Sequence, residues 1–187
     1  MAIQKKPIKL IKTKDGLINF DETLLQQREI FLHYAVSEEV CDILISQLLV
    51  LDKMNHNPIY LHINSPGGYV SWGLALIDTI KSLKSKVIAV GSGCIASMAT
   101  VIFISCPERT CHKNTTFMFH DIFAGGSDYG AKLEARMDFQ KKEWLTLVDH
   151  IRKHTKLNEE ELSFMRSGEL WLFADDAKKK GVVDTII

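Results

Sequence analysis

A serine, a histidine and a glycine-rich turn are the residues of this sequence that could carry out acyl transfer. Ser97 lies among small residues at 93–99, and His120 directly follows the apolar stretch 115–119. A serine hydroxyl is a poor nucleophile until a base takes its proton, and an imidazole serves as that base when an acidic group orients it. The turn at 64–68 could offer backbone N–H groups to a bound carbonyl oxygen, because glycine lets the main chain approach closely.

Each of these features also has a structural explanation. A serine before a helix is a common N-cap, and a histidine after a strand is often an ordinary core or surface residue. The Pro-Gly pair in the turn is typical of a type II connection between a strand and a helix. Their order along the chain favours chemistry, since each follows a predicted strand and the carboxyl ends of strands in an open α/β sheet share one crevice.

The elements expected around these residues alternate between strand and helix. Strands are predicted at 29–32, 58–63, 86–90 and 115–119, and Gly-Ser-Gly at 91–93 is expected to break the third. Helices are predicted after the first three strands, the third of them at about 97–104. Ser37 is expected to cap the first helix, with an apolar face formed by Val40, Ile43, Leu44 and Leu48. This alternation predicts βαβ units and a largely parallel sheet.

A long amphipathic helix is expected beyond the glycine-containing joint at 124–126. Its predicted apolar stripe contains Leu133, Met137, Trp144, Val148 and Ile151. So long a helix is unusual in a small domain, and its stripe needs another surface to cover it. A second subunit would supply that surface.

Composition limits the other classes of function. The chain has 187 residues, enough for one α/β domain, and its 23 basic and 23 acidic residues give no net field that would attract nucleic acid. Lysines cluster near the N-terminus without interleaved aromatic residues, which favours a flexible or partner-docking segment over a nucleic-acid arm. No apolar run is long enough for a membrane span, and we expect a cytoplasmic protein. The four cysteines lack metal-site spacing and are expected to be free thiols.

The sequence resembles the Clp protease proteolytic subunit over nearly its whole length, from about Leu25 to Val183. The most specific match is the combination of the turn at 63–68, the Ala-Ser-Met-Ala motif at 96–99 and the Met-Phe-His motif at 118–120. The resemblance implies an α/β fold of repeated βαβ units, shared with crotonases, with a protruding handle helix. It also implies an N-terminal axial or partner-docking segment (1–27), a head (28–123 and 157–187) and a handle (124–156).

The same resemblance implies a serine peptidase site. Ser97 would be the nucleophile and His120 the general base, with the backbone N–H groups of Gly68 and Met98 forming the oxyanion hole. It implies two stacked heptameric rings of this chain, which degrade unfolded polypeptide delivered by a hexameric AAA+ unfoldase. ATP would be used by that partner, and no cofactor or metal is expected in this chain. Cys94, near Ser97, matches a family position that is not catalytic.

The sequence departs from the family pattern at the third catalytic residue. Glu169 stands at the position of the family's aspartate, and Gly168 and Leu170 replace the arginines that usually flank it. Asp121, which follows the histidine directly, is a rival orienting acid, although neighbouring residues on a strand point to opposite faces. Because Ser97, His120, Gly68 and Met98 are all retained, we expect an active endopeptidase, with Glu169 rather than Asp121 as its acid. The alternatives are a catalytically weak structural ring subunit and, more remotely, an acyl-CoA enzyme of the crotonase type.

Overall fold

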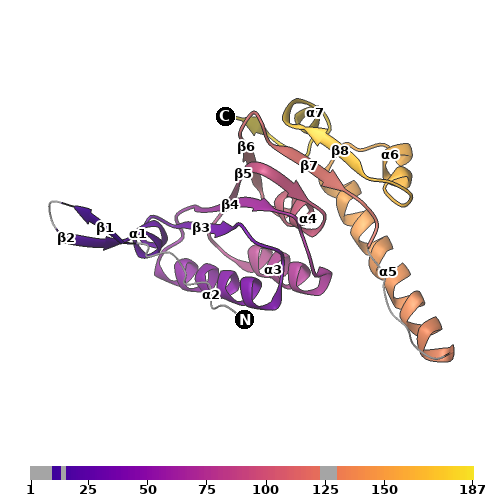
Figure 1. Ribbon diagram of the computed structural model, residues 1–187, viewed down its shortest axis with the longest axis horizontal. Coiled ribbons are helices and arrows are strands. Elements are labelled where there is room, and N and C mark those ends of the chain that lie inside the picture. The colour runs from indigo at the N-terminus through magenta and orange to yellow at the C-terminus, as the bar shows by residue number, and fades with distance from the viewer. Residues whose placement is uncertain (1–9, 14–15, 123–129) are drawn as a thin grey trace, which may run out of the picture.

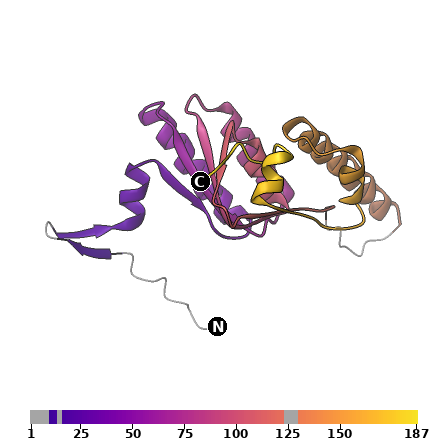
Figure 2. The same ribbon diagram turned by 90° about the horizontal axis from the view of Figure 1, so that it is seen from above.

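The computed structural model describes residues 10–13, 16–122 and 130–187, which form an α/β fold around one mixed sheet (Figure 1). The sheet joins seven of the described strands, namely β3 (Glu29–Leu32), β4 (Ile59–Ser65), β5 (Val87–Ala96), β6 (Glu108–Cys111), β7 (Thr116–Phe119), β8 (Leu170–Phe173) and β9 (Thr185–Ile186). The described helices are α1 (Phe20–Gln26), α2 (Glu38–Met54), α3 (Val70–Ser82), α4 (Met98–Ser105), α5 (Gly130–His154), α6 (Glu159–Phe164) and α7 (Ala174–Lys179). A separate antiparallel pair, β1 (Leu10–Thr13) and β2 (Gly16–Asn19), extends away from this body (Figure 2).

The centre of the fold is a run of parallel strands connected by helices. β3, β4, β5 and β6 pair in that order and are all parallel, with α2, α3 and α4 as their connections. α5 projects beyond the sheet as a long arm (Figure 1). The predicted α/β fold of repeated βαβ units with a handle helix is therefore confirmed. The predicted joint at 124–126 lies outside the described residues, and the division of the chain into head and handle stays a prediction.

The expected end of the third strand at 91–93 is wrong. β5 continues to Ala96, because Gly93 adopts a φ of 61° and Asn64 Oδ1 accepts the N–H of Cys94 at 3.1 Å, so the chain bends without leaving the sheet. Before the bend β5 pairs with β6, and after it with β7. The longer strand thus delivers the chain directly to Ser97.

The helices pack as their composition suggests, with one exception. Ser37 Oγ accepts the N–H of Val40 at 3.4 Å and caps α2 as predicted. The buried face of α2 contains Cys41, Leu44, Leu48 and Leu51, whereas Ile43 is 50% exposed, so its predicted place in the core is wrong. Every residue of α4 is buried, which makes it the central helix of the core. All four cysteines are free, as predicted.

The handle helix α5 is buried over its C-terminal half only. Trp144, Val148 and Ile151 are buried against the core of the same chain, so the expectation that a second subunit must cover this part of the stripe is wrong, whereas Met137 is 60% exposed. No helix in the described ranges is long and apolar enough to cross a membrane. On the buried half, His150 Nε2 lies 2.7 Å from Ser105 Oγ, which itself donates to the carbonyl of Val101. The imidazole therefore donates to the serine and joins α5 to α4.

Burial, with additional repulsion from His154, Lys81 and Lys153, lowers the pKa of His150 to about 4. Between pH 6.5 and 4 the unfolded chain therefore binds a proton that the folded chain does not, and stability falls as the pH drops through this range. We expect His150 to account for about 1 kcal/mol of the stability lost between pH 7 and 5, after a discount for partial exposure of the ring. Urea unfolding at several pH values checks this.

The matched variants are His150→Gln and His112→Gln, the latter on an exposed loop position. In His150→Gln, the free energy of unfolding lost between pH 7 and 5 should be smaller than in wild type by about 1 kcal/mol. In His112→Gln, that loss should equal the loss in wild type. An unchanged pH dependence in His150→Gln would contradict the assignment.

Candidate active site

Ser97 lies at a strained turn between β5 and α4. Its φ of 55° and ψ of −128° are uncommon for a residue with a side chain, and such strain is typical of functional turns. The main chain is fixed on both sides, since the N–H of Ser97 donates to the carbonyl of Met118 at 2.9 Å and its own carbonyl accepts from Thr100 at 3.0 Å. The serine occupies the N-cap position, yet its side chain makes no capping hydrogen bond.

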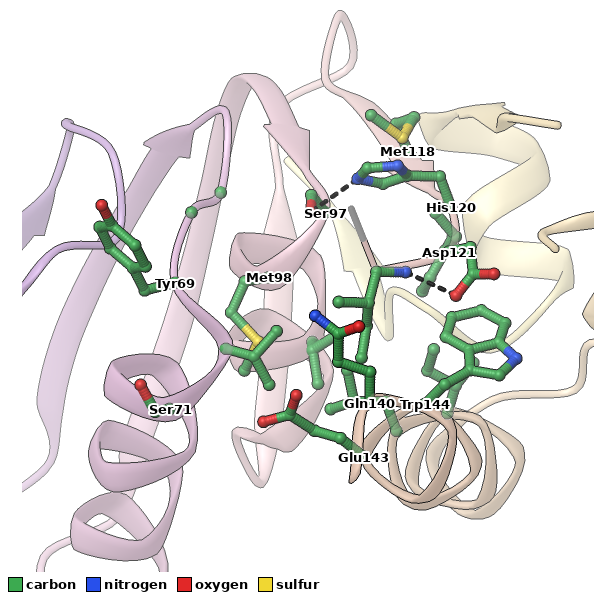
Figure 3. Close-up of a pocket in the computed structure, with 18 of the residues that line it drawn as sticks. Tyr69, Ser71, Ser97, Met98, Met118, His120, Asp121, Gln140, Glu143 and Trp144 are labelled. Carbon is green, nitrogen blue, oxygen red and sulfur yellow. Dashed lines mark hydrogen bonds between the residues drawn. The ribbon is translucent and has the colours of Figure 1, made fainter. Parts of the chain in front are cut away.

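The side chain of Ser97 is directed to His120 instead. Ser97 Oγ lies 2.8 Å from His120 Nε2, so the two residues predicted to act together are in hydrogen-bond contact (Figure 3). The carbonyl of Met118 also accepts a hydrogen bond from Thr100 Oγ1 at 2.9 Å. The end of β7, which carries His120, is therefore held by the same helix start that carries Ser97.

The turn at 64–68 is packed against this pair by its main chain. The hydroxyl of Ser65 accepts the N–H of Gly67 at 3.2 Å and donates to the carbonyl of Tyr34 at 2.6 Å. Gly67 has a φ of 87°, and a Cβ there would lie 2.6 Å from the carbonyl oxygen of Ala96 and 2.7 Å from Ser97 Cβ. Only glycine fits such a contact, so the turn can touch the nucleophile's backbone.

The N–H group of Gly68, the second glycine of the turn, is not used in pairing with the neighbouring segment. Val36 bonds to the residues on either side of Gly68, donating to the carbonyl of Gly67 and accepting from the N–H of Tyr69, each at 2.9 Å. In this parallel pairing the N–H of Gly68 itself points away from Val36. The N–H of Met98 belongs to the first turn of α4 and has no partner within the helix. Gly68 and Met98 line the same cavity as Ser97 and His120, which is what an oxyanion hole requires, and their role stays a prediction.

The acid that would orient His120 is not in contact with it. Glu169 accepts a hydrogen bond from Trp171 Nε1 at 2.9 Å, and Asp121 accepts one from the N–H of Ile122 at 2.7 Å. Throughout the described part of the chain, no hydrogen bond joins either carboxylate to the imidazole. β7 and β8 pair antiparallel and their ladder ends with Phe119 opposite Leu170, and one further step in the same register would bring Glu169 opposite His120. Opposed residues project to the same face of a sheet, and this register favours Glu169 over Asp121.

A cavity of about 580 Å³ opens beside the Ser97–His120 pair (Figure 3). One wall comes from the turn at 66–68 and the start of α3, and the opposite wall comes from α5. The α5 side chains in it are Gln140, Glu143, Trp144, Leu147 and Ile151. None of them was predicted as a site residue, because the only signal on this helix was the apolar stripe. Over the described ranges no group of three or more His, Cys, Asp or Glu side chains is arranged to hold a metal.

Comparison with known proteins agrees with this geometry. The family model for Clp protease matches residues 13–187. The chain belongs to the Clp protease family. The "ATP-dependent Clp protease proteolytic subunit" of Deinococcus radiodurans is 31% identical over 186 residues, covering 97% of this chain and 91% of that protein. The "ATP-dependent Clp protease proteolytic subunit 3" of Rhizobium etli is 29% identical over 171 residues, covering 89% of this chain and 87% of that protein. The resemblance found in the sequence is thereby confirmed.

The contact at Gly67 predicts a specific cost of substitution. In Gly67→Ala the new Cβ would meet backbone atoms of Ala96 and Met98 at 2.6 and 2.8 Å, and alanine would also be strained at this φ. We expect the free energy of unfolding to fall by at least about 2 kcal/mol, measured by urea denaturation.

Gly181→Ala is the matched control, because Gly181 also has a positive φ of 68° but its Cβ would meet mainly the flexible side chain of Lys156. The free energy of unfolding of Gly181→Ala should fall by about 1 kcal/mol, from backbone strain alone. Equal losses in the two variants would show that the close approach at Ser97 is not the cause.

Proposed function

We propose that this chain is an active serine endopeptidase, the proteolytic subunit of a Clp-type protease that cuts unfolded polypeptides into short peptides. The observation that carries the proposal is the 2.8 Å contact of Ser97 Oγ with His120 Nε2. It is the more telling because Ser97 occupies the N-cap position of α4 without capping it. A serine kept for helix stability would direct its oxygen to the backbone N–H groups of α4.

The mechanism that these residues support is acyl transfer. Ser97 Oγ attacks the peptide carbonyl carbon while His120 Nε2 accepts the hydroxyl proton, and the carbonyl oxygen becomes an oxyanion facing the N–H groups of Gly68 and Met98. The intermediate collapses as His120 returns the proton to the leaving amine, which breaks the C–N bond. Water then attacks the acyl-enzyme, His120 takes its proton, and the acid product leaves with Ser97 regenerated.

Glu169 is the proposed positioning residue for His120. Its register opposite His120 supports this role, and the hydrogen bond from Trp171 holds its carboxylate on the face that the two residues share. A glutamate carries one more methylene than the family's aspartate and has the reach to exchange Trp171 for the imidazole. In that position it would fix the tautomer that leaves Nε2 free to accept the serine proton.

The proposed particle is two stacked heptameric rings with a hexameric AAA+ unfoldase docked on them, located in the cytoplasm. The relatives are named ATP-dependent proteolytic subunits, which supports a separate ATPase that feeds polypeptide to this chain. The exposed apolar side chains Met137, Phe139 and Leu145 on α5 support coverage of the handle by another subunit. ATP would act on the unfoldase, and this chain would need no cofactor.

Labelling of the assembled particle by a fluorophosphonate tests the nucleophile. We expect a stoichiometric adduct on the peptide that contains Ser97, found by mass spectrometry, and its loss together with peptide hydrolysis in Ser97→Ala. Ser71→Ala is the control, because Ser71 lines the same cavity but lies on α3, apart from the Ser97–His120 pair (Figure 3). An assembled particle without an adduct at Ser97 would favour the structural ring subunit, and coenzyme A ester binding without peptide hydrolysis would favour the crotonase-type alternative.

Two isosteric variants decide between the candidate acids. Glu169→Gln should lower kcat/KM for a peptide substrate by about 10²- to 10⁴-fold, because an amide cannot stabilise the imidazolium, whereas Asp121→Asn should change it less than threefold. Glu169→Asp should restore most of the activity. The reverse pattern, with Asp121→Asn the more damaging change, would assign the role to Asp121.

A further inference from the structure

The cavity beside Ser97 has a pronounced negative character. Its described lining contains the carboxylates of Asp121 and Glu143 and no lysine or arginine. Asp121 already accepts the N–H of Ile122. Glu143, on the opposite wall formed by α5, has no such hydrogen bond from the main chain in the described ranges.

Glu143 also lacks the ion pairs that other acidic residues of this chain make. Asp149 pairs with Lys153, and Glu161 with Lys180, but in the described ranges no basic side chain pairs with Glu143. Its neighbours three and four positions away on α5 are uncharged, namely Phe139, Gln140, Thr146 and Leu147. Glu143 is half-buried in the wall of the cavity, so a positively charged group brought into the cavity could pair with its carboxylate.

The walls between Ser97 and Glu143 suit the aliphatic part of a long side chain. Met98 follows the nucleophile directly and contacts α3 at Gly73, and Figure 3 shows the side chains of Gln140 and Glu143 extending from α5 toward Met98. Val70, Val101 and Leu147 add apolar surface to the same cavity. A lysine or arginine stem packs well on such a surface while its charged end reaches a polar group.

We propose that Glu143 makes this peptidase prefer lysine or arginine at the residue whose carbonyl Ser97 attacks. This inference rests on the proposed function. With the carbonyl oxygen at the N–H groups of Gly68 and Met98, the side chain on the acyl side of the scissile bond is the one nearest the Met98 wall of the cavity. Its methylenes pack on that wall, and its cation pairs with the carboxylate of Glu143.

Two peptide substrates that differ only at this residue test the inference on the assembled particle. One carries lysine and the other norleucine, which has a similar length and no charge. We expect wild-type kcat/KM to be at least tenfold higher for the lysine peptide, with a ratio that falls as salt is raised. Glu143→Gln should bring the ratio to one or below, mainly through the lysine peptide, and Glu134→Gln, at an exposed position of the same helix, should leave it unchanged.

The outcomes separate the inference from the proposed function. If wild type cleaves the norleucine peptide as well as or better than the lysine peptide, Glu143 does not set specificity, although Ser97 chemistry stands. The same holds if Glu143→Gln keeps the wild-type ratio, as expected if a cation from a neighbouring subunit already neutralises Glu143. If two phosphonate probes with the same side chains both fail to label Ser97, the proposed function fails and this inference with it.

Discussion

The close backbone contact between the turn at Gly67 and the turn at Ser97 is the constraint on which the site depends. With a side chain at Gly67, its Cβ would lie 2.7 Å from Ser97 Cβ, and the two strand ends would have to separate. This close approach brings Gly68 and Met98 to the same cavity as Ser97. Ser65, through its hydrogen bonds to Tyr34 and Gly67, fixes the turn that contains Gly67.

The second strand end is positioned by hydrogen bonds to one carbonyl. Met118, on β7, accepts the N–H of Ser97, and the hydroxyl of Thr100 is shared between the carbonyls of Met118 and Ile95, each at 2.9 Å. His120, two residues after Met118, is thereby held beside Ser97. These bonds also stabilise the positive φ at Ser97, which would cost about 1 to 3 kcal/mol without such support. The same contacts therefore support the strained backbone of Ser97 and hold His120 next to it.

The handle helix α5 contributes the carboxylate of Glu143 to the cavity beside Ser97. Its C-terminal half is fixed to the core by buried apolar side chains and by the neutral imidazole of His150, which donates to Ser105 on α4. With α5 held in this way, Glu143 lies in the cavity wall. Helix α5 thus carries exposed apolar side chains and also forms one side of the cavity beside Ser97, so a change in the position of the helix would change the shape of the cavity.

The sequence by itself determined the α/β fold, the Ser97–His120 pair and the importance of the turn at 64–68, because turn chemistry and residues at strand ends are local features. The predictions that depended on tertiary contacts were wrong or left open. The strand expected to stop at Gly91–Gly93 continues because Asn64, on a neighbouring strand, accepts the N–H of Cys94. Local sequence could not tell whether Ser97 caps α4 or contacts His120, and the tertiary structure places its hydroxyl on the imidazole without a capping hydrogen bond. Glu143 could not be found in advance, since its place in the cavity depends on how α5 folds back onto α4.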